Sequence, residues 1–248
     1  MTYSDYPKGP TGETPVEDAG FFTRWMWVYF SPRKAFSAIL HRPAWVAPFI
    51  LLVILTGITS HIGAPVGREY MQQRIEESEA MSEEAKEQAL ERMGGEESMI
   101  AKVGRIAGSA VFAGVVLLAL GGVLLFINNL ILGASARYAQ MLAAGCYISL
   151  VWIPSWIVKM PIMLMQRTMQ VAIGPAALLP PESEGSLTWA LLSRLDLFGI
   201  WEVILACIAL SAIGGYTAKR AAAAVVPMWV IYGIIVAVIT WFGFSQLG

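Results

Sequence analysis

The chain is short of the residues on which most enzyme and metal sites depend. Its 248 residues include two histidines and two cysteines, and charged residues make up only 14%. A soluble domain carries about 25% charged residues, so an ordinary soluble fold is excluded. The sequence also lacks an HExxH pair, a GxSxG element and paired aspartates within apolar segments. We therefore expect no catalytic residue, no cofactor and no bound metal.

The two cysteines, Cys146 and Cys207, both lie within long apolar segments. In that setting they are best interpreted as packing residues rather than as a disulfide or a metal pair. No signal peptide is evident, because residues 1–43 lack a short apolar stretch followed by a small-residue cleavage site. We expect the first apolar segment to act as its own insertion signal.

Apolar residues are abundant instead, at 56% of the chain with a mean hydropathy of +0.60. Each apolar run is long enough for a helix to cross about 30 Å of hydrocarbon. In lipid every backbone amide needs an internal partner, so a continuous run of this length becomes a helix rather than a barrel strand. The sequence therefore predicts an all-α integral membrane protein, with residues 44–248 forming one domain of five spans at about 44–62, 106–132, 139–160, 197–218 and 225–245.

The segment before the first span divides into two parts. Residues 1–20 are rich in proline, glycine and acidic residues, which predicts a disordered tail. Residues 21–43 predict two short interfacial helices on the cytoplasmic side, the second starting at Ser31-Pro32. Their basic residues form a candidate patch for anionic lipid headgroups, or alternatively serve only as a topology signal: Arg24, Arg33, Lys34 and Arg42.

The distribution of basic residues predicts how the chain sits in the membrane. Three of the N-terminal basic residues lie close to the first span, whereas loop 63–105 spreads its basic residues among many glutamates. Basic residues near the spans favour the cytoplasmic side. We predict a cytoplasmic N-terminus and an external C-terminus.

Loop 63–105 is the one sizeable hydrophilic segment. Ser82 followed by two glutamates indicates a helix start, and Gly94-Gly95 indicates its end. We expect an acidic, helical external loop, either simply solvated or used to bind a protein partner. Its carboxylates lack the glycine turn and bidentate acid of a calcium loop.

Few polar residues lie within or beside the spans. Lys159, Asp196 and Glu202 are expected on one side of the membrane, where Lys159 could pair with either acid. A carboxylate in a span is costly and is usually paired or functional. The cluster is thus either a structural ion pair with a helix cap or a site for a proton or substrate. Asn128 and Asn129 are expected to bond a neighbouring helix.

Four segments in this order resemble the Yip family, the membrane proteins named for interaction with Ypt/Rab GTPases. They are FSPRKAFSAILHRPAWVAPF, GASARYAQ, SLVWIP, whose proline should kink the third span, and LDLFGIWEVIL. The resemblance covers about residues 25–245 and implies five helices with a cytoplasmic N-terminus and a lumenal or external C-terminus. The residues that carry it are Pro32, Phe36, Pro43, Pro154, Asp196, Phe198 and Trp201.

The short N-terminal region and the acidic loop are similar to bacterial members, which implies a bacterial cytoplasmic (inner) membrane. A Rab-type GTPase partner is implied only for a eukaryotic protein. The favoured function is a non-enzymatic membrane scaffold, organiser or partner-binding protein in membrane or lipid homeostasis or trafficking. It would bind membrane lipids, including anionic ones, and a protein partner or a second copy, but no nucleic acid. The alternatives are a small-molecule or lipid transporter or channel using the Lys159, Asp196 and Glu202 cluster, and an intramembrane enzyme.

Overall fold

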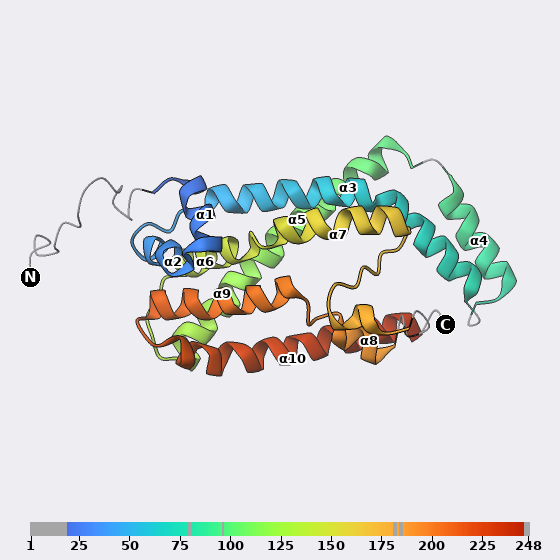
Figure 1. The fold of residues 1–248 in the computed structure, drawn as a ribbon. Coiled ribbons are helices and arrows are strands. Elements are labelled where there is room, and N and C mark those ends of the chain that lie inside the picture. The colour runs from blue at the N-terminus through green and yellow to red at the C-terminus, as the bar shows by residue number, and fades with distance from the viewer. Residues whose placement is uncertain (1–18, 79–80, 96, 181–182, 184–185, 246–248) are drawn as a thin grey trace, which may run out of the picture.

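The computed structural model describes residues 19–78, 81–95, 97–180, 183 and 186–245, so most of the predicted disordered tail lies outside the described residues. Within these residues the chain is helical and has no strand. Five helical segments are long and apolar enough to cross a membrane, which confirms the predicted architecture. They form an elongated bundle with the N-terminal helices at one end and the last residues of the final helix at the other (Figure 1).

The first three spans are α3 (Val46–Glu77), α5 (Met99–Phe126) and the pair α6 (Tyr138–Ser149) and α7 (Trp152–Gln166). The last two are α9 (Leu197–Gly214) and α10 (Ala218–Ser245). The shorter elements are α1 (Phe21–Phe30), α2 (Pro32–His41), α4 (Glu83–Gly94), η3 (Pro175–Leu178) and α8 (Leu187–Leu192).

Two spans differ from the predicted bounds in an informative way. The first span was expected to end near residue 62, but α3 continues through Pro65 to Glu77, because the residues beyond the apolar run are mostly good helix formers. The fourth was expected to reach residue 218, but α9 ends at Gly214, and Gly215 has a φ of 72°. That left-handed conformation suits glycine and closes the helix.

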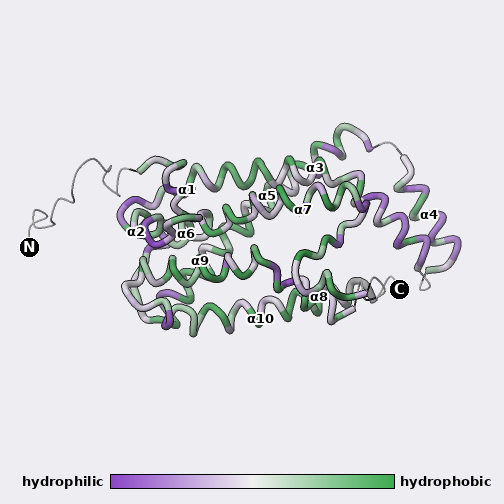
Figure 2. Tube along the Cα trace, viewed as in Figure 1, coloured by the Kyte–Doolittle hydropathy of each residue, from purple (hydrophilic) through white to green (hydrophobic). Residues whose placement is uncertain are grey.

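The predicted external loop is mostly helix. It consists of the second half of α3, then α4, then the first turns of α5, which starts at Met99. Ser82 is the N-cap of α4, since its Oγ accepts from the Ala85 amide at 3.3 Å. Figure 2 shows this end of the bundle as its most hydrophilic part.

The core centres on α6. Every residue from Met141 to Ser149 is buried, and α6 packs between α5, α9 and the N-terminal helices. α6 comes close to α5, where a Cβ added at Gly121 would lie 3.0 Å from the Leu142 Cα. A glycine there lets the two backbones come together, as small residues do in membrane helix pairs.

The third span is broken one turn before the expected kink. Pro154 has no amide hydrogen to donate to the Leu150 carbonyl four residues earlier. The helix is interrupted at Leu150 and Val151, and α7 starts at Trp152. The Leu150 carbonyl instead accepts from the Tyr29 hydroxyl at 2.8 Å and from the Ile153 amide at 3.1 Å. The Tyr29 hydroxyl of α1 thus supplies a hydrogen bond that Pro154 cannot donate.

α5 ends in a π-helical turn, η2 (Ile127–Ile131), which contains the two asparagines. The Asn128 Oδ1 accepts from the Tyr216 hydroxyl at 2.8 Å, in the connection between α9 and α10. Asn129 bonds both the amide and the carbonyl of Ala136. The asparagines thus bond connecting segments rather than a neighbouring helix as expected: Asn128 meets the α9–α10 connection, and Asn129 holds the turn that leads to α6.

Candidate functional site

α1 and α2 form a hairpin that is part of the fold rather than a pair of helices lying only on a lipid surface. Ala35, Phe36 and Ile39 of α2 are fully buried in the same apolar cluster as residues of α6 and α9. The Gln140 Nε2 also donates to the Leu40 carbonyl at 2.8 Å. The predicted amphipathic face of α2 therefore packs against protein.

Arg24 departs from its predicted role. It was predicted to meet lipid headgroups, yet its side chain is 1% exposed. Its Nε donates to the Ala19 carbonyl at 2.8 Å and its Nη1 to the Arg42 carbonyl at 2.7 Å. Burial lowers the pKa of Arg24. The guanidinium joins the start of α1 to the end of α2 and does not face the lipid.

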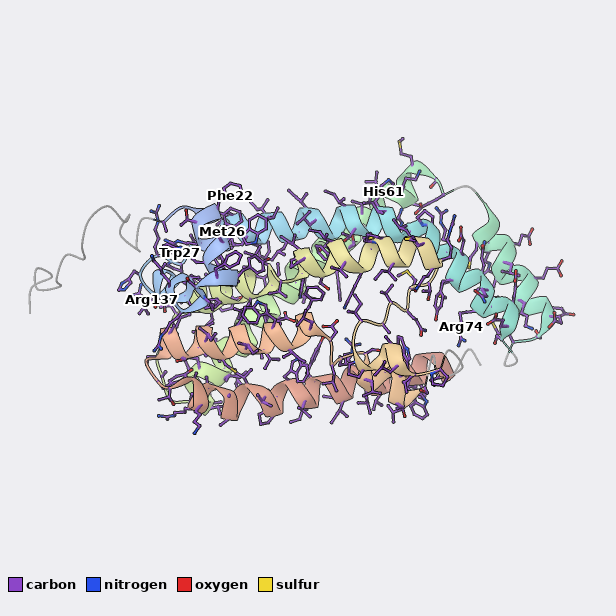
Figure 3. The ribbon with its side chains drawn as sticks, viewed as in Figure 1. Phe22, Met26, Trp27, His61, Arg74 and Arg137 are labelled. Atoms are coloured by element: carbon purple, nitrogen blue, oxygen red, sulfur yellow. The ribbon has the colours of Figure 1, made fainter. Side chains whose placement is uncertain are left out.

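The outer face of the hairpin carries an apolar stripe. Phe22, Met26 and Phe30 are 72%, 56% and 77% exposed, and their four-residue spacing places them on one side of α1. Figure 3 labels Phe22 and Met26. Close by in the sequence, Arg33 and Arg42 are exposed. We call Phe22, Met26, Phe30 and the basic residues Arg33, Lys34 and Arg42 the hairpin surface.

Lys34 belongs to this surface but is half-buried. Its Nζ lies 4.6 Å from the centre of the Trp27 ring, a cation–π contact that holds the side chain along the hairpin. Of the four basic residues of the predicted patch, three therefore remain at the surface and Arg24 does not.

The predicted polar cluster is brought together only in part. Lys159 forms an ion pair with Asp196, which is also the N-cap of α9, since its Oδ1 accepts from the Gly199 amide at 2.6 Å. Glu202 accepts instead from the Trp152 Nε1 at 3.2 Å. Asp196 is buried, so its two partners satisfy a group that would otherwise be costly there. This arrangement serves to fix α7 and α9 to each other.

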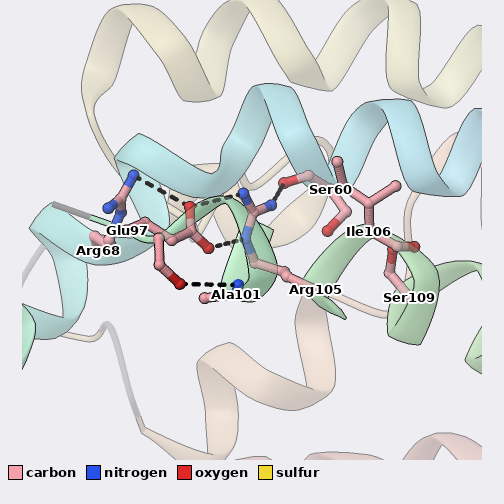
Figure 4. A network of polar contacts seen from close by, with 8 residues as sticks. Ser60, Arg68, Glu97, Ala101, Arg105, Ile106 and Ser109 are labelled. Atoms are coloured by element: carbon pink, nitrogen blue, oxygen red, sulfur yellow. Dashed lines mark hydrogen bonds and ion pairs between the residues drawn. The ribbon is translucent and has the colours of Figure 1, made fainter. Parts of the chain in front are cut away.

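A charged network at the α4 end of the bundle was missed from the sequence (Figure 4). The Arg105 Nε and Nη2 donate to the two Glu97 oxygens at 3.0 and 3.1 Å, and Nη1 donates to the Ser60 carbonyl at 2.8 Å. Arg68 approaches the same carboxylate at 3.7 Å. The hydrogen bond from Arg105 lowers the pKa of Glu97. The sequence showed only scattered charges here, because these residues are up to 45 positions apart.

The sequence of this helical bundle matches a known domain family. A model of the Yip1 domain matches residues 26–240, from the second half of α1 to near the end of α10. The chain belongs to the Yip1 domain family. Searches of curated proteins and of solved structures find no match to it. With its five apolar helices, this Yip1 domain chain is a multi-pass integral membrane protein.

The residues that carried the resemblance occupy structural positions in the Yip1 domain. Pro32 begins α2 and Phe36 is fully buried. Pro43 lies in the connection to α3, and Asp196 caps α9. Phe198 and Trp201 pack, half-buried, against the core. Together with the break before Pro154, these residues fix where the hairpin and the spans begin.

Proposed function

We propose that this Yip1 domain protein is a non-enzymatic membrane organiser that holds the α1–α2 hairpin at the cytoplasmic surface, where it binds anionic lipids and meets a protein partner. The observation that carries the proposal is the hairpin surface, in which exposed apolar residues of α1 and basic residues at the two ends of α2 belong to one element fixed to the bundle. Apolar side chains can enter the headgroup region while basic ones meet lipid phosphates.

The hairpin surface should bind lipid weakly and in one orientation. Fully burying a large apolar side chain is worth about 1.5–3 kcal/mol, and each basic residue near an anionic surface about 1 kcal/mol. The membrane helices already hold the chain in the bilayer, so this energy serves to position the hairpin. Since Arg24 holds α1 to the end of α2 and Tyr29 ties α1 to Leu150 of the bundle, little entropy is lost when the hairpin surface is bound.

The charge at the two ends supports a cytoplasmic hairpin. None of the acidic residues that the structure describes lies at the hairpin end, whereas α4 and its neighbours are rich in glutamate. Basic residues collect at the hairpin end instead: Arg33, Lys34, Arg42, Arg137, Lys219 and Arg220. Such a separation follows the positive-inside rule. We place the protein in a bacterial cytoplasmic membrane with the N-terminus inside.

The proposal is tested on the full chain in nanodiscs. Phe30→Cys is labelled with a polarity-sensitive dye, while Cys146 and Cys207 are buried and serve as an internal check on labelling. Emission should shift to the blue as phosphatidylglycerol replaces phosphatidylcholine, and the shift should shrink at high salt. The same label on Lys86→Cys of α4 is the control. A label on residue 30 that stays water-exposed at every lipid composition would rule the proposal out.

A further inference from the structure

An open cavity lies at the α4 end of the bundle, far from the hairpin. Its volume is about 510 Å³, within the range of roughly 300–1,000 Å³ typical of small-molecule sites. The second half of α3 and the middle of α7 form its two long walls. The start of α5 and the residues just after α7 complete it.

The lining is apolar and rich in methionine. Five thioether side chains contribute: Met71, Met93, Met160, Met163 and Met169. Gly63 and Gly67 make the α3 wall concave, since a Cβ at Gly63 would lie 3.2 Å from the Met163 Cε and one at Gly67 3.8 Å from the Met169 Sδ. Methionine adapts to irregular apolar partners. A flexible hydrocarbon chain is such a partner.

The charged residues of the cavity favour an anionic head. They are three cations, Arg68, Arg105 and Lys159, and one carboxylate, Glu97, with Lys159 already paired to Asp196 outside the lining. Glu97 is bonded to Arg105 on both oxygens. Among the described residues Arg68 has only the 3.7 Å ion pair with that carboxylate, and its side chain is 42% exposed. Its guanidinium therefore keeps donors for a phosphate, the anion that an arginine fork matches best.

We propose that this cavity binds an anionic phospholipid of the bilayer, with one acyl chain among the methionines and the phosphate on Arg68. The walls of the cavity are membrane helices whose other faces expose Ile58, Ile62 and Ile157, so hydrocarbon chains lie beside it. The cavity does not involve the hairpin surface. Lipid held here would join α7 to α3 and α5, which already meet through Arg105 and Ser60 (Figure 4).

The test uses full-length protein in nanodiscs doped with phosphatidylglycerol that carries a photoactivatable group near the end of one acyl chain. Crosslinked peptides are mapped by mass spectrometry, and an equal dose of the matching phosphatidylcholine probe gives the neutral arm. Arg68→Gln removes the charge and Gly67→Phe fills the cavity, with Ala64→Leu as a second filling variant. The controls are Lys102→Gln and Gly104→Phe, at exposed positions of α5 outside the lining.

We expect the phosphatidylglycerol probe to label segments 59–71 and 156–171 in the wild type and in both controls. Arg68→Gln should reduce this labelling about tenfold, as loss of one charge-assisted hydrogen bond implies, and a filling variant should abolish it. Equal labelling by the neutral probe would refute the preference for an anionic lipid, and unchanged labelling of Arg68→Gln would refute the role of Arg68. Unchanged labelling in the folded filling variants would refute the cavity. Either failure leaves the hairpin proposal standing, because the hairpin label reports on a separate surface.

Discussion

Substituting Arg24 tests most sharply whether this residue holds the hairpin together or binds lipid. Arg24→Met keeps an unbranched side chain of similar length but removes both hydrogen bonds, to the carbonyls of Ala19 and Arg42. Hydrogen bonds to charged groups are worth about 1.5–3 kcal/mol each. Part of this is offset, because the substitution also removes the cost of desolvating a buried cation. We expect hairpin opening to become easier by about 2–4 kcal/mol.

Hairpin opening can be measured by cysteine labelling of a buried position on α2. Ala35 is fully buried, so the thiol of Ala35→Cys should react only when the hairpin opens. A loss of 2 kcal/mol corresponds to an increase of about thirtyfold in the labelling rate of the Arg24→Met variant. Arg24→Lys should rescue little, because an ammonium lacks the planar fork that reaches both carbonyls.

The matched control is Arg33→Met on the exposed side of α2. It should leave the labelling rate within about threefold of the parent, since surface substitutions usually change stability by less than about 0.5 kcal/mol. Equal labelling rates for Arg24→Met and Arg33→Met would refute the internal role of Arg24. Weaker vesicle binding by Arg24→Met with an unchanged labelling rate would restore the headgroup interpretation.

Three further predictions concern other contacts. Tyr29→Phe leaves the Leu150 carbonyl without its hydroxyl donor and should lower thermal stability in detergent by about 1 kcal/mol; no change would mean that the break before Pro154 does not depend on α1. Glu202→Gln keeps an oxygen that can accept from Trp152, so the melting temperature of the protein should be almost unchanged. If the protein is an organiser, proton or substrate flux across reconstituted vesicles should also be unchanged. Loss of that flux with folding intact would favour the transport alternative. Because the pKa of Glu97 is lowered in the folded protein, its contribution is present above the ordinary carboxyl pKa of about 4.3 and is lost as the pH falls through the lower folded value. The protection of amides at the start of α5 against hydrogen exchange, relative to the intrinsic exchange rate at each pH, should therefore fall at acid pH in the wild type but not in Glu97→Gln. Equal profiles would contradict the network.

Local patterns were sufficient for features that depend on neighbouring residues. The apolar runs predicted five spans, Ser82 and Gly94 predicted the ends of α4, and Ser31-Pro32 predicted the start of α2. Asp196 was predicted as a cap or an ion-pair partner of Lys159, and the structure shows both contacts. Each of these signals lies within a few residues of the feature that it specifies.

Contacts between distant segments were not predictable in this way. An arginine between aromatic residues gives the same pattern whether it meets a phosphate or, like Arg24, a carbonyl 18 residues away. The apolar face of α2 likewise gives the same sequence pattern whether it faces lipid or packs against α6 and α9. Tyr29 reaches a carbonyl 121 positions along the chain, and the Glu97 network depends on α3 continuing beyond its apolar run. Such features follow from packing, which a single sequence does not specify.

The central claim is that five helices cross the membrane, with the hairpin inside and the α4 end outside. Impermeant maleimide labelling of single cysteines in intact cells tests it most directly. The account predicts labelling at Lys86→Cys and at a cysteine appended after Gly248, with Arg33→Cys and Arg137→Cys labelled only after the membrane is opened. Labelling of residue 33 and of the C-terminal cysteine from the same side would mean an even number of crossings and would contradict it.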